Sequence, residues 1–388
     1  MKVESNYMCV KSKIWIGLVV LFVLSCSKEQ NHNNSSPTPY SISIPPYFPT
    51  LLNIPYDNPL TVEGIKLGRY LFYDGRLSGR TDSLMSCYTC HIQAHGFECG
   101  LTNSDYPDGH PHGLTGIPTP HTMLPMINLV WNANGYLWNG KIYPSNPDSN
   151  YRNIENLVSM AILAPHEIHG SIEKTVEMIQ SIPLYPPMFK AAFGTNEITL
   201  GRISKAIAQF VRTLISADSR FDQYMRGELQ LSSQELNGFV LFTTENGGDC
   251  FHCHGGEGNP LFTTNLFYNN GKDTCFSGSC EDTRDRYHIT GNTNDIGAYR
   301  APTLRNIEFT APYMHDGRFK TLDEVLHFYN EGVKNTPYTN SLMHHAANGG
   351  VRLTASQLND IKAFLLSLSD QGFITNPAFS RPDDPALP

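Results

Sequence analysis

Helical periodicity dominates the pattern of hydrophobic positions along the chain. Two stretches carry apolar residues three and four positions apart, as expected where one face of a helix is buried. Their members are Ile203, Ile207, Phe210, Val211 and Leu214 in the first stretch, and Leu358, Ile361, Leu365 and Leu368 in the second. No clear run of alternating apolar and polar residues, the mark of half-buried strands, accompanies them. The pattern predicts a mainly α fold.

Start signals accompany two of the predicted helices. Ser232 with Glu235, and Thr354 with Gln357, have the spacing of capping boxes, in which two side chains satisfy free backbone N–H groups at a helix start.

Length and charge narrow the class of protein further. The 388 residues suffice for two domains, and 31 Gly and 26 Pro predict many loops. The formal charge of -8, without a run of Lys or Arg, argues against nucleic acid as a partner.

The amino-terminal segment predicts export. Two lysines precede an apolar run over residues 14–24, which is too short to span a bilayer and is typical of a signal peptide. The run leads into Val-Leu-Ser-Cys, ending at Cys26, which resembles a bacterial lipobox. Residues 1–26 are therefore expected to be a lipoprotein signal peptide, with Cys26 anchoring a periplasmic or cell-envelope protein to the membrane. An ordinary leader with a chance cysteine is the alternative. Residues 27–50, initially rich in Asn, Ser and Pro, are expected to form a flexible tether.

Four further cysteines lie in two copies of one motif. Residues 87–91 read Cys-Tyr-Thr-Cys-His, and residues 250–254 read Cys-Phe-His-Cys-His. Both are C-x-x-C-H, the attachment sequence of c-type haem, in which two thiols form thioethers and the adjacent imidazole binds iron. The predicted attachment residues are Cys87, Cys90, Cys250 and Cys253, and the predicted proximal iron ligands are His91 and His254. A thioredoxin-like redox motif would need a βαβ context, and a zinc site would leave the doubled His unexplained.

The segments that precede the two motifs are also related. Residues 67–72 and residues 236–242 each read as a short amphipathic helix leading into a haem-binding turn. This internal repeat predicts two cytochrome c-like domains, each with one covalently bound haem. We place the N-terminal domain at residues 51–222 and the C-terminal domain at residues 223–388.

Three cysteines remain outside the leader and the motifs. Cys275 and Cys280 flank a short loop, and in an oxidising compartment we expect them to form a disulfide. Two free thiols are the alternative. Cys99 then stays unpaired, and we expect it to be buried near the first haem.

From residue 56 to about residue 370 the sequence resembles the bacterial di-haem cytochrome c peroxidases and the MauG-like tryptophylquinone-maturation enzymes of the same superfamily. The stretches that carry the resemblance, besides the first haem motif, are residues 67–78, 137–140, 260–263, 290–292, 301–306 and 310–317. The match is specific for the family and less specific for the substrate.

The resemblance implies a role for each half. The haem on His91 corresponds to the peroxidatic haem, and the haem on His254 to the electron-transfer haem. Trp138 matches a tryptophan that lies between the haems, with a plain core aromatic as the alternative. Glu167 matches the distal carboxylate that moves protons at the peroxide site, with a helix-start acid as the alternative.

Two departures from the peroxidases concern axial ligands. The C-terminal haem usually has a Met ligand, whereas the matching position here is Tyr329, as in the maturation enzyme. Tyr329 also lies on an apolar helix face, so it could be a core residue, and Met343 and Met314 are substitutes. A phenolate ligand would lower the haem potential.

The second departure concerns the mobile distal His that the peroxidases often carry on the N-terminal haem. His121 is nearest to the matching place, with His110 and His112 nearby. The resemblance also implies a calcium ion between the domains, held partly by backbone carbonyls. Its candidate ligands are Asn128, Thr310 and Pro312.

Three functions follow from these patterns. The first is reduction of hydrogen peroxide to water with electrons from an external cytochrome c or small redox protein. The second is MauG-like oxidation of residues on a partner protein, which Tyr329 favours. The third is a non-enzymatic two-haem electron carrier, against which Glu167 argues. A homodimer is left open as the assembly.

Overall fold

The computed structural model describes residues 36–101, 105–106, 108–256 and 258–388. The predicted signal peptide, its lipobox and the start of the predicted tether lie outside these residues. No helix within the described part of the chain is long and apolar enough to cross a bilayer.

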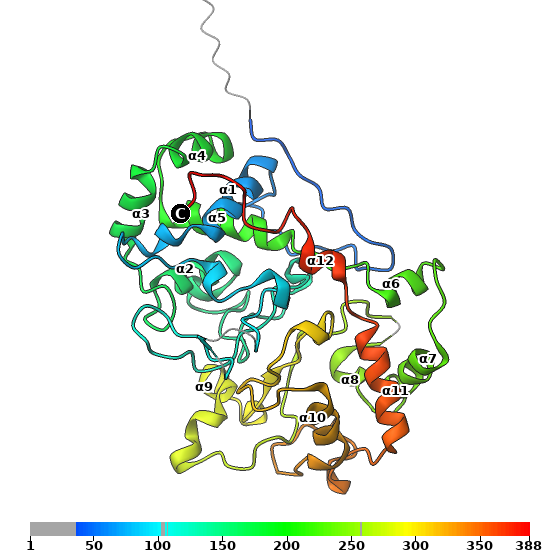
Figure 1. Cartoon of the computed structure of the whole chain (residues 1–388). Helices are drawn as coiled ribbons and strands as arrows, with labels where there is room; N and C mark the ends of the chain where they lie inside the picture. Colours follow the sequence, from blue (N-terminus) through cyan, green and yellow to red (C-terminus); the bar gives the residue numbers. More distant parts are fainter. Residues whose placement is uncertain (1–35, 102–104, 107, 257) are drawn as a thin grey trace, which may run out of the picture. The chain divides into compact units, whose positions relative to one another are not determined.

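Short helices joined by long loops make up the described residues, which confirms the mainly α prediction (Figure 1). The helices are α1 Val62–Tyr73, α2 Ile154–Leu163, α3 Ile172–Ser181, α4 Tyr185–Phe193, α5 Leu200–Arg212, α6 Arg220–Met225, α7 Ser233–Phe242, α8 Phe251–His254, α9 Arg286–Thr290, α10 Leu322–His327, α11 Ala355–Leu366 and α12 Gln371–Thr375. One antiparallel pair, β1 Phe267–Tyr268 and β2 Tyr299–Arg300, several 3-10 turns and one π-helical turn, Phe328–Gly332, complete the described elements.

In the first half, helix α1 packs across helix α5, which carries residues 203–211 of the predicted apolar stripe, and Leu214 follows the helix end. The crossing is close because α1 has a glycine there. A Cβ on Gly68 would come within 1.9 Å of the Ala206 carbonyl oxygen. Thr61 caps α1 by accepting a hydrogen bond from the backbone N–H of Gly64.

The second half repeats this arrangement. Helix α7 packs across α11, and a Cβ on Gly238 would come within 1.9 Å of the Asp360 carbonyl oxygen. Both predicted capping boxes are present, at Ser232 for α7 and at Thr354 for α11. The pairs α1–α5 and α7–α11 thus use the same device, a glycine at the crossing that lets two backbones approach.

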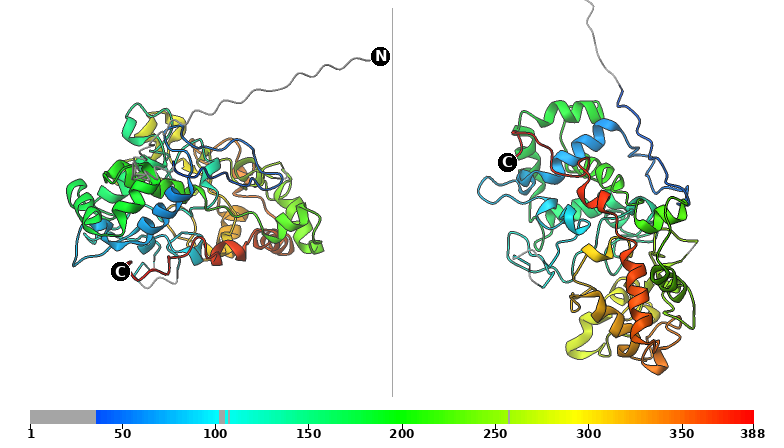
Figure 2. Two further views of the ribbon diagram at one scale, coloured as in Figure 1. Left: turned by 90° about the horizontal axis from the view of Figure 1, so that it is seen from above. Right: turned by 45° about the vertical axis from the view of Figure 1, so that its right-hand side comes forward.

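Each half has its own buried core. The first core draws on residues 67–214, and the second on residues 221–368. The ribbon views show helices α1 to α5 grouped apart from α7, α8, α10 and α11 (Figures 1 and 2). The chain end returns to the first half, where Phe373 and Phe379 join the first core. Tyr73 donates a hydrogen bond to the Phe379 carbonyl at 2.6 Å, which ties this tail down. The exact domain boundaries stay a prediction.

The tether prediction is wrong for residues 36–50. This segment belongs to the same compact unit as the rest of the described chain. Phe48 is buried against Trp131 and Leu261, and Pro39 forms a backbone bridge with Thr61. Polar composition suggested a solvated linker, whereas a few apolar side chains suffice to dock the segment.

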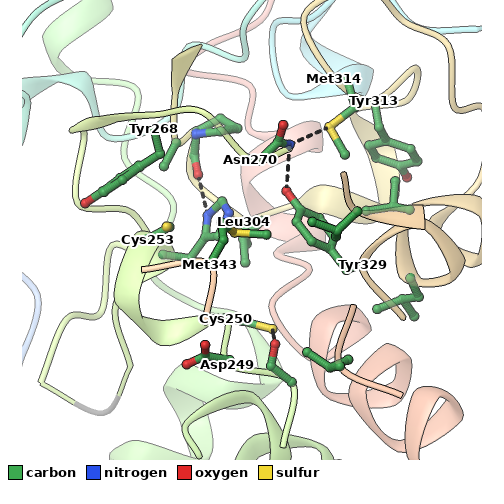
Figure 3. Close-up of a pocket in the computed structure, with 18 of the residues that line it drawn as sticks. Asp249, Cys250, Cys253, Tyr268, Asn270, Leu304, Tyr313, Met314, Tyr329 and Met343 are labelled. Carbon is green, nitrogen blue, oxygen red and sulfur yellow. Dashed lines mark hydrogen bonds between the residues drawn. The ribbon is translucent and has the colours of Figure 1, made fainter. Parts of the chain in front are cut away.

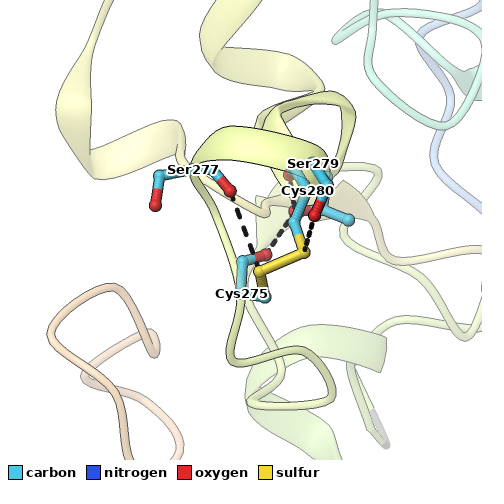
Figure 4. Close-up of a disulfide and its surroundings, with 5 residues drawn as sticks. Cys275, Ser277, Ser279 and Cys280 are labelled. Carbon is cyan, nitrogen blue, oxygen red and sulfur yellow. Dashed lines mark hydrogen bonds between the residues drawn. A yellow bond between two sulfur atoms is a disulfide. The ribbon is translucent and has the colours of Figure 1, made fainter.

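The prediction for the remaining cysteines is confirmed. Cys275 and Cys280 form a disulfide across the short loop (Figure 4). Thr283 donates hydrogen bonds to the carbonyls of both cysteines, which shapes the same turn. Cys99 is unpaired and fully buried.

Candidate haem sites

The first motif folds into a 3-10 turn, Cys87–Thr89, whose N-cap is Ser86. The His91 ring is enclosed by protein, and burial lowers its pKa to about 4. His91 Nδ1 donates to the Phe97 carbonyl at 2.7 Å. A neutral imidazole with Nδ1–H engaged in this way presents the lone pair of Nε2 to a metal.

The second motif reproduces these features on helix α8. His254 Nδ1 donates to the Pro302 carbonyl at 3.1 Å, and burial lowers the His254 pKa to about 4. The four motif cysteines, Cys87, Cys90, Cys250 and Cys253, form no disulfide, and burial raises each thiol pKa to about 12. Paired thiols beside a neutral, oriented imidazole are the donor set that haem c requires.

A cavity of about 190 Å³ opens beside the second motif (Figure 3). Its lining is mainly apolar and includes Cys250, Cys253, His254, Tyr268, Leu304, Tyr313, Tyr329 and Met343. Asn270 lies at its edge and donates to the Tyr329 hydroxyl at 3.1 Å and toward the Met314 sulfur at 3.8 Å. The structure thus brings all three candidate axial ligands to one cavity. Burial raises the Tyr329 pKa, so its phenol is neutral until a cation replaces the proton.

Arg300 provides a test of whether haem fits this cavity. Its side chain is buried and lines the cavity wall, yet its Nε has no hydrogen-bond partner, and its Nη1 reaches only the Gly135 carbonyl at 3.3 Å. Burial lowers its pKa to about 10. A buried guanidinium normally has an anionic partner. A haem propionate is such an anion, so the residues present fit the group.

Glu167 lies at the first motif, as predicted from the resemblance. It follows α2 in a turn, and burial raises its pKa to about 7. Burial is the main cause of the raised pKa of the Cys87 and Cys90 thiols, and the nearby Glu167 carboxylate raises both values further. A Cβ on Gly113 would come within 1.6 Å of the Glu167 carbonyl oxygen, so the loop at Gly113 is closely packed against the Glu167 backbone.

Trp138 lies at the junction of the two halves. It lines the cavity beside the second motif, and its indole N–H donates to the Thr122 carbonyl at 2.9 Å. Its ring centroid is 6.3 Å from that of His315, which stacks on Tyr299 at 3.5 Å. Aromatic contact across the junction suits a bridging tryptophan, a role that stays a prediction.

His121 belongs to the same junction. Its Nε2 lies against the Asp285 carboxylate, and its ring is edge-on to Tyr299 and His315. All three partners come from the second half. By contrast, His112 precedes Gly113, which packs on the Glu167 backbone. The distal role of His121 stays a prediction.

The calcium ligands also stay a prediction. Asn128 is buried, and its carboxamide accepts from the Ser216 N–H at 2.9 Å and donates to the Ser216 carbonyl at 3.0 Å. A cation would therefore need the second lone pair of that amide oxygen. Thr310 is buried, and Pro312 follows a cis peptide bond.

Paired thiols, oriented neutral imidazoles and a two-core helical fold define the class as a two-haem c-type cytochrome. Similarity to known proteins narrows this class to a family. A family model described as di-haem cytochrome c peroxidase matches residues 62–230. Methylamine utilization protein MauG of Methylorubrum extorquens is 34% identical over 73% of each chain. Cytochrome-c peroxidase IdrP1 of Denitromonas iodatirespirans is 30% identical over 86% of this chain and 87% of its own.

Solved structures agree. A MauG-like protein associated with microbial copper homeostasis superposes with a TM-score of 0.75 at 31% identity, covering 88% of this chain and 99% of its own. The di-haem peroxidase BthA of Burkholderia thailandensis shares the fold, with a TM-score of 0.67 at 18% identity over 84% and 92%. The chain therefore belongs to the di-haem cytochrome c peroxidase family, which includes MauG. It is an oxidoreductase with two haem c groups, which rules against the electron-carrier hypothesis.

Sequence reasoning assigned no role to Arg300, Asp285, Tyr299 or His315. Arg300 and His315 adjoin or lie in stretches that carry the resemblance, which is the only signal that marks them. Their position at the junction follows from the packing of the two halves.

Proposed function

We propose that this protein reduces hydrogen peroxide to water with two electrons and two protons from outside the chain, the electrons coming from a cytochrome c or another small redox protein. Relatives named cytochrome-c peroxidase support this reaction. We further propose, from the amino-terminal pattern, that it works in the cell envelope. When bound, the two haems supply iron and redox equivalents.

The observation that carries the proposal is the state of Glu167. A carboxyl with a pKa of about 7 is present in both protonation states near neutral pH. It can therefore take a proton from one peroxide oxygen and return it to the other, which general acid–base catalysis requires. An ordinary surface Glu would be ionised throughout this range.

Neighbouring backbone holds this acid in place. Thr115 donates to the Pro165 carbonyl at 2.7 Å, and Glu167 N–H donates to the Ala164 carbonyl at 3.0 Å. With Gly113 packed on the Glu167 backbone, these contacts fix the stretch of main chain from which the acid projects. Burial of the carboxyl is what raises its pKa.

Peroxide-dependent oxidation of a reduced cytochrome c tests the proposal. The assay uses protein whose intact mass shows two added haems. We expect saturable oxidation of the donor, with two electrons consumed per peroxide. Failure to oxidise cytochrome c or small copper proteins, in protein that carries both haems, would contradict it.

Tyr329 favours a second candidate function, MauG-like oxidation of a partner protein. Its hydroxyl shares the cavity with the second motif and receives a hydrogen bond from Asn270 (Figure 3). The resemblance places an axial tyrosine in the maturation enzyme at this position. Mass spectrometry of a co-purified partner before and after peroxide would reveal oxidised residues if this function holds.

A further inference from the structure

The third position of the second haem motif is a histidine that haem attachment does not use. His252 lies between Cys250 and Cys253 in helix α8, and its side chain is 19% exposed. Thioethers engage the two cysteines, and the iron takes His254. His252 is therefore free for another role.

Asp249 fixes the orientation of the His252 ring. His252 Nδ1 donates to Asp249 Oδ1 at 2.7 Å, and the Asp249 carboxylate is nearly buried. This hydrogen bond leaves the lone pair on His252 Nε2, which lies 3.8 Å from Glu245 Oε1. A carboxylate behind a histidine in this way is typical of metal-binding imidazoles.

A second histidine comes from a distant part of the chain. His344 Nδ1 lies 3.4 Å from Asp249 Oδ2, and its ring centroid is 5.0 Å from that of His252. The adjacent His345 donates from Nε2 to the Glu245 carbonyl at 2.7 Å, which joins the two segments. One ligand atom each from Glu245, His252 and His344 lie within 4.8 Å of one another.

We propose that Glu245, His252 and His344 form a binding site for a divalent transition metal ion of the Zn²⁺ type, with Asp249 orienting the imidazoles. Two imidazoles and one carboxylate are a common ligand set for such ions. Ligands about 2.1 Å from zinc lie about 3.4 Å apart in a tetrahedron. Glu245 and His344 are exposed, so small side-chain rotations close the set. Water completes the coordination.

The test is zinc binding by the intact protein carrying both haems. After chelator treatment, the protein is dialysed against Zn²⁺ with calcium in excess, which fills oxygen-ligand sites. Bound zinc is then counted by elemental analysis, and its affinity is measured by calorimetry. We expect one zinc ion per chain. Retention of no zinc would overturn the proposal.

Variants separate this site from adventitious binding. His344→Gln and Glu245→Gln should each weaken zinc binding at least about tenfold, and Asp249→Asn about tenfold to a hundredfold. His327→Gln is the matched control, because His327 is an exposed histidine paired with Glu331 at 2.8 Å on another helix. Its zinc affinity should equal that of the wild type.

The assignment does not depend on substituting within the haem motif. Glu245 lies outside both the motif and the lining of the cavity beside it, so its variant tests the site even where a change at His252, or at the cavity-lining His344, affects the haem. Wild-type affinity in both His344→Gln and Glu245→Gln, with haem spectra unchanged, would refute the site. An equal loss in His327→Gln would refute it as well, since that result means binding by scattered surface histidines.

Discussion

Replacing Glu167 by Gln removes a proton-carrying group from the first haem site and changes few contacts. The amide keeps the size of the carboxyl but cannot exchange a proton near neutral pH. General acid–base groups contribute about a hundredfold or more. A hundredfold loss corresponds to about 2.7 kcal/mol in activation free energy. We therefore expect peroxide turnover in Glu167→Gln to fall at least about a hundredfold, with both haems retained.

The pH dependence gives a second measure of the same residue. Burial raises the Glu167 pKa from 4.5 to about 7 in the folded state. Because the folded value is the higher one, the resulting stabilisation is complete below pH 4.5 and is lost as pH rises to about 7. The wild type should lose up to about 3 kcal/mol of its free energy of unfolding across this window relative to Glu167→Gln.

Two measurements check this reasoning. Stopped-flow rates with hydrogen peroxide give the turnover, and denaturant titrations at several pH values give the free energy of unfolding. Glu173→Gln serves as the control, because Glu173 is an exposed acid at the start of α3. Wild-type turnover in Glu167→Gln would remove the acid from the mechanism. Parallel stability curves for wild type and Glu167→Gln would show that its pKa is not raised.

Two further predictions concern the second haem, and a third concerns a buried ion pair. Tyr329→Phe should change the spectrum and raise the potential of the second haem, because a phenolate ligand stabilises ferric iron; an unchanged redox titration makes Tyr329 a core residue only. Arg300→Gln should lower the same potential, because a buried cation disfavours the oxidised iron; an unaltered potential contradicts its pairing with a propionate. Asp222→Asn should lower the free energy of unfolding by about 3–5 kcal/mol, because Arg305 is fully buried and bonded to both Asp222 oxygens at 2.7 and 2.8 Å. Asp57→Asn, which breaks an exposed ion pair, should cost at most about 1 kcal/mol, and equal losses in the two denaturant titrations would refute the difference.

Packing between distant segments decided what the sequence alone left open. The partners of His121 come from residues 285–315, and the tail at residues 371–388 returns to the first core. Residues 36–50 have a linker-like start yet dock through Phe48. The three proposed metal ligands span residues 245–344 and meet only because two loops are joined. Local composition does not encode such contacts, since each depends on where another segment lies.

The sequence by itself determined the features whose chemistry is contiguous. A haem motif needs five neighbouring residues, a capping box four, and the disulfide loop six, so each can be recognised before the fold is known. The helix stripes and the family followed from the same local patterns. Arg300 shows the limit of reasoning from sequence. An arginine can be recognised as an anion-binding residue only when the fold has buried it away from water and left its Nε without a partner. That burial is a property of the tertiary structure, and the sequence shows only an arginine.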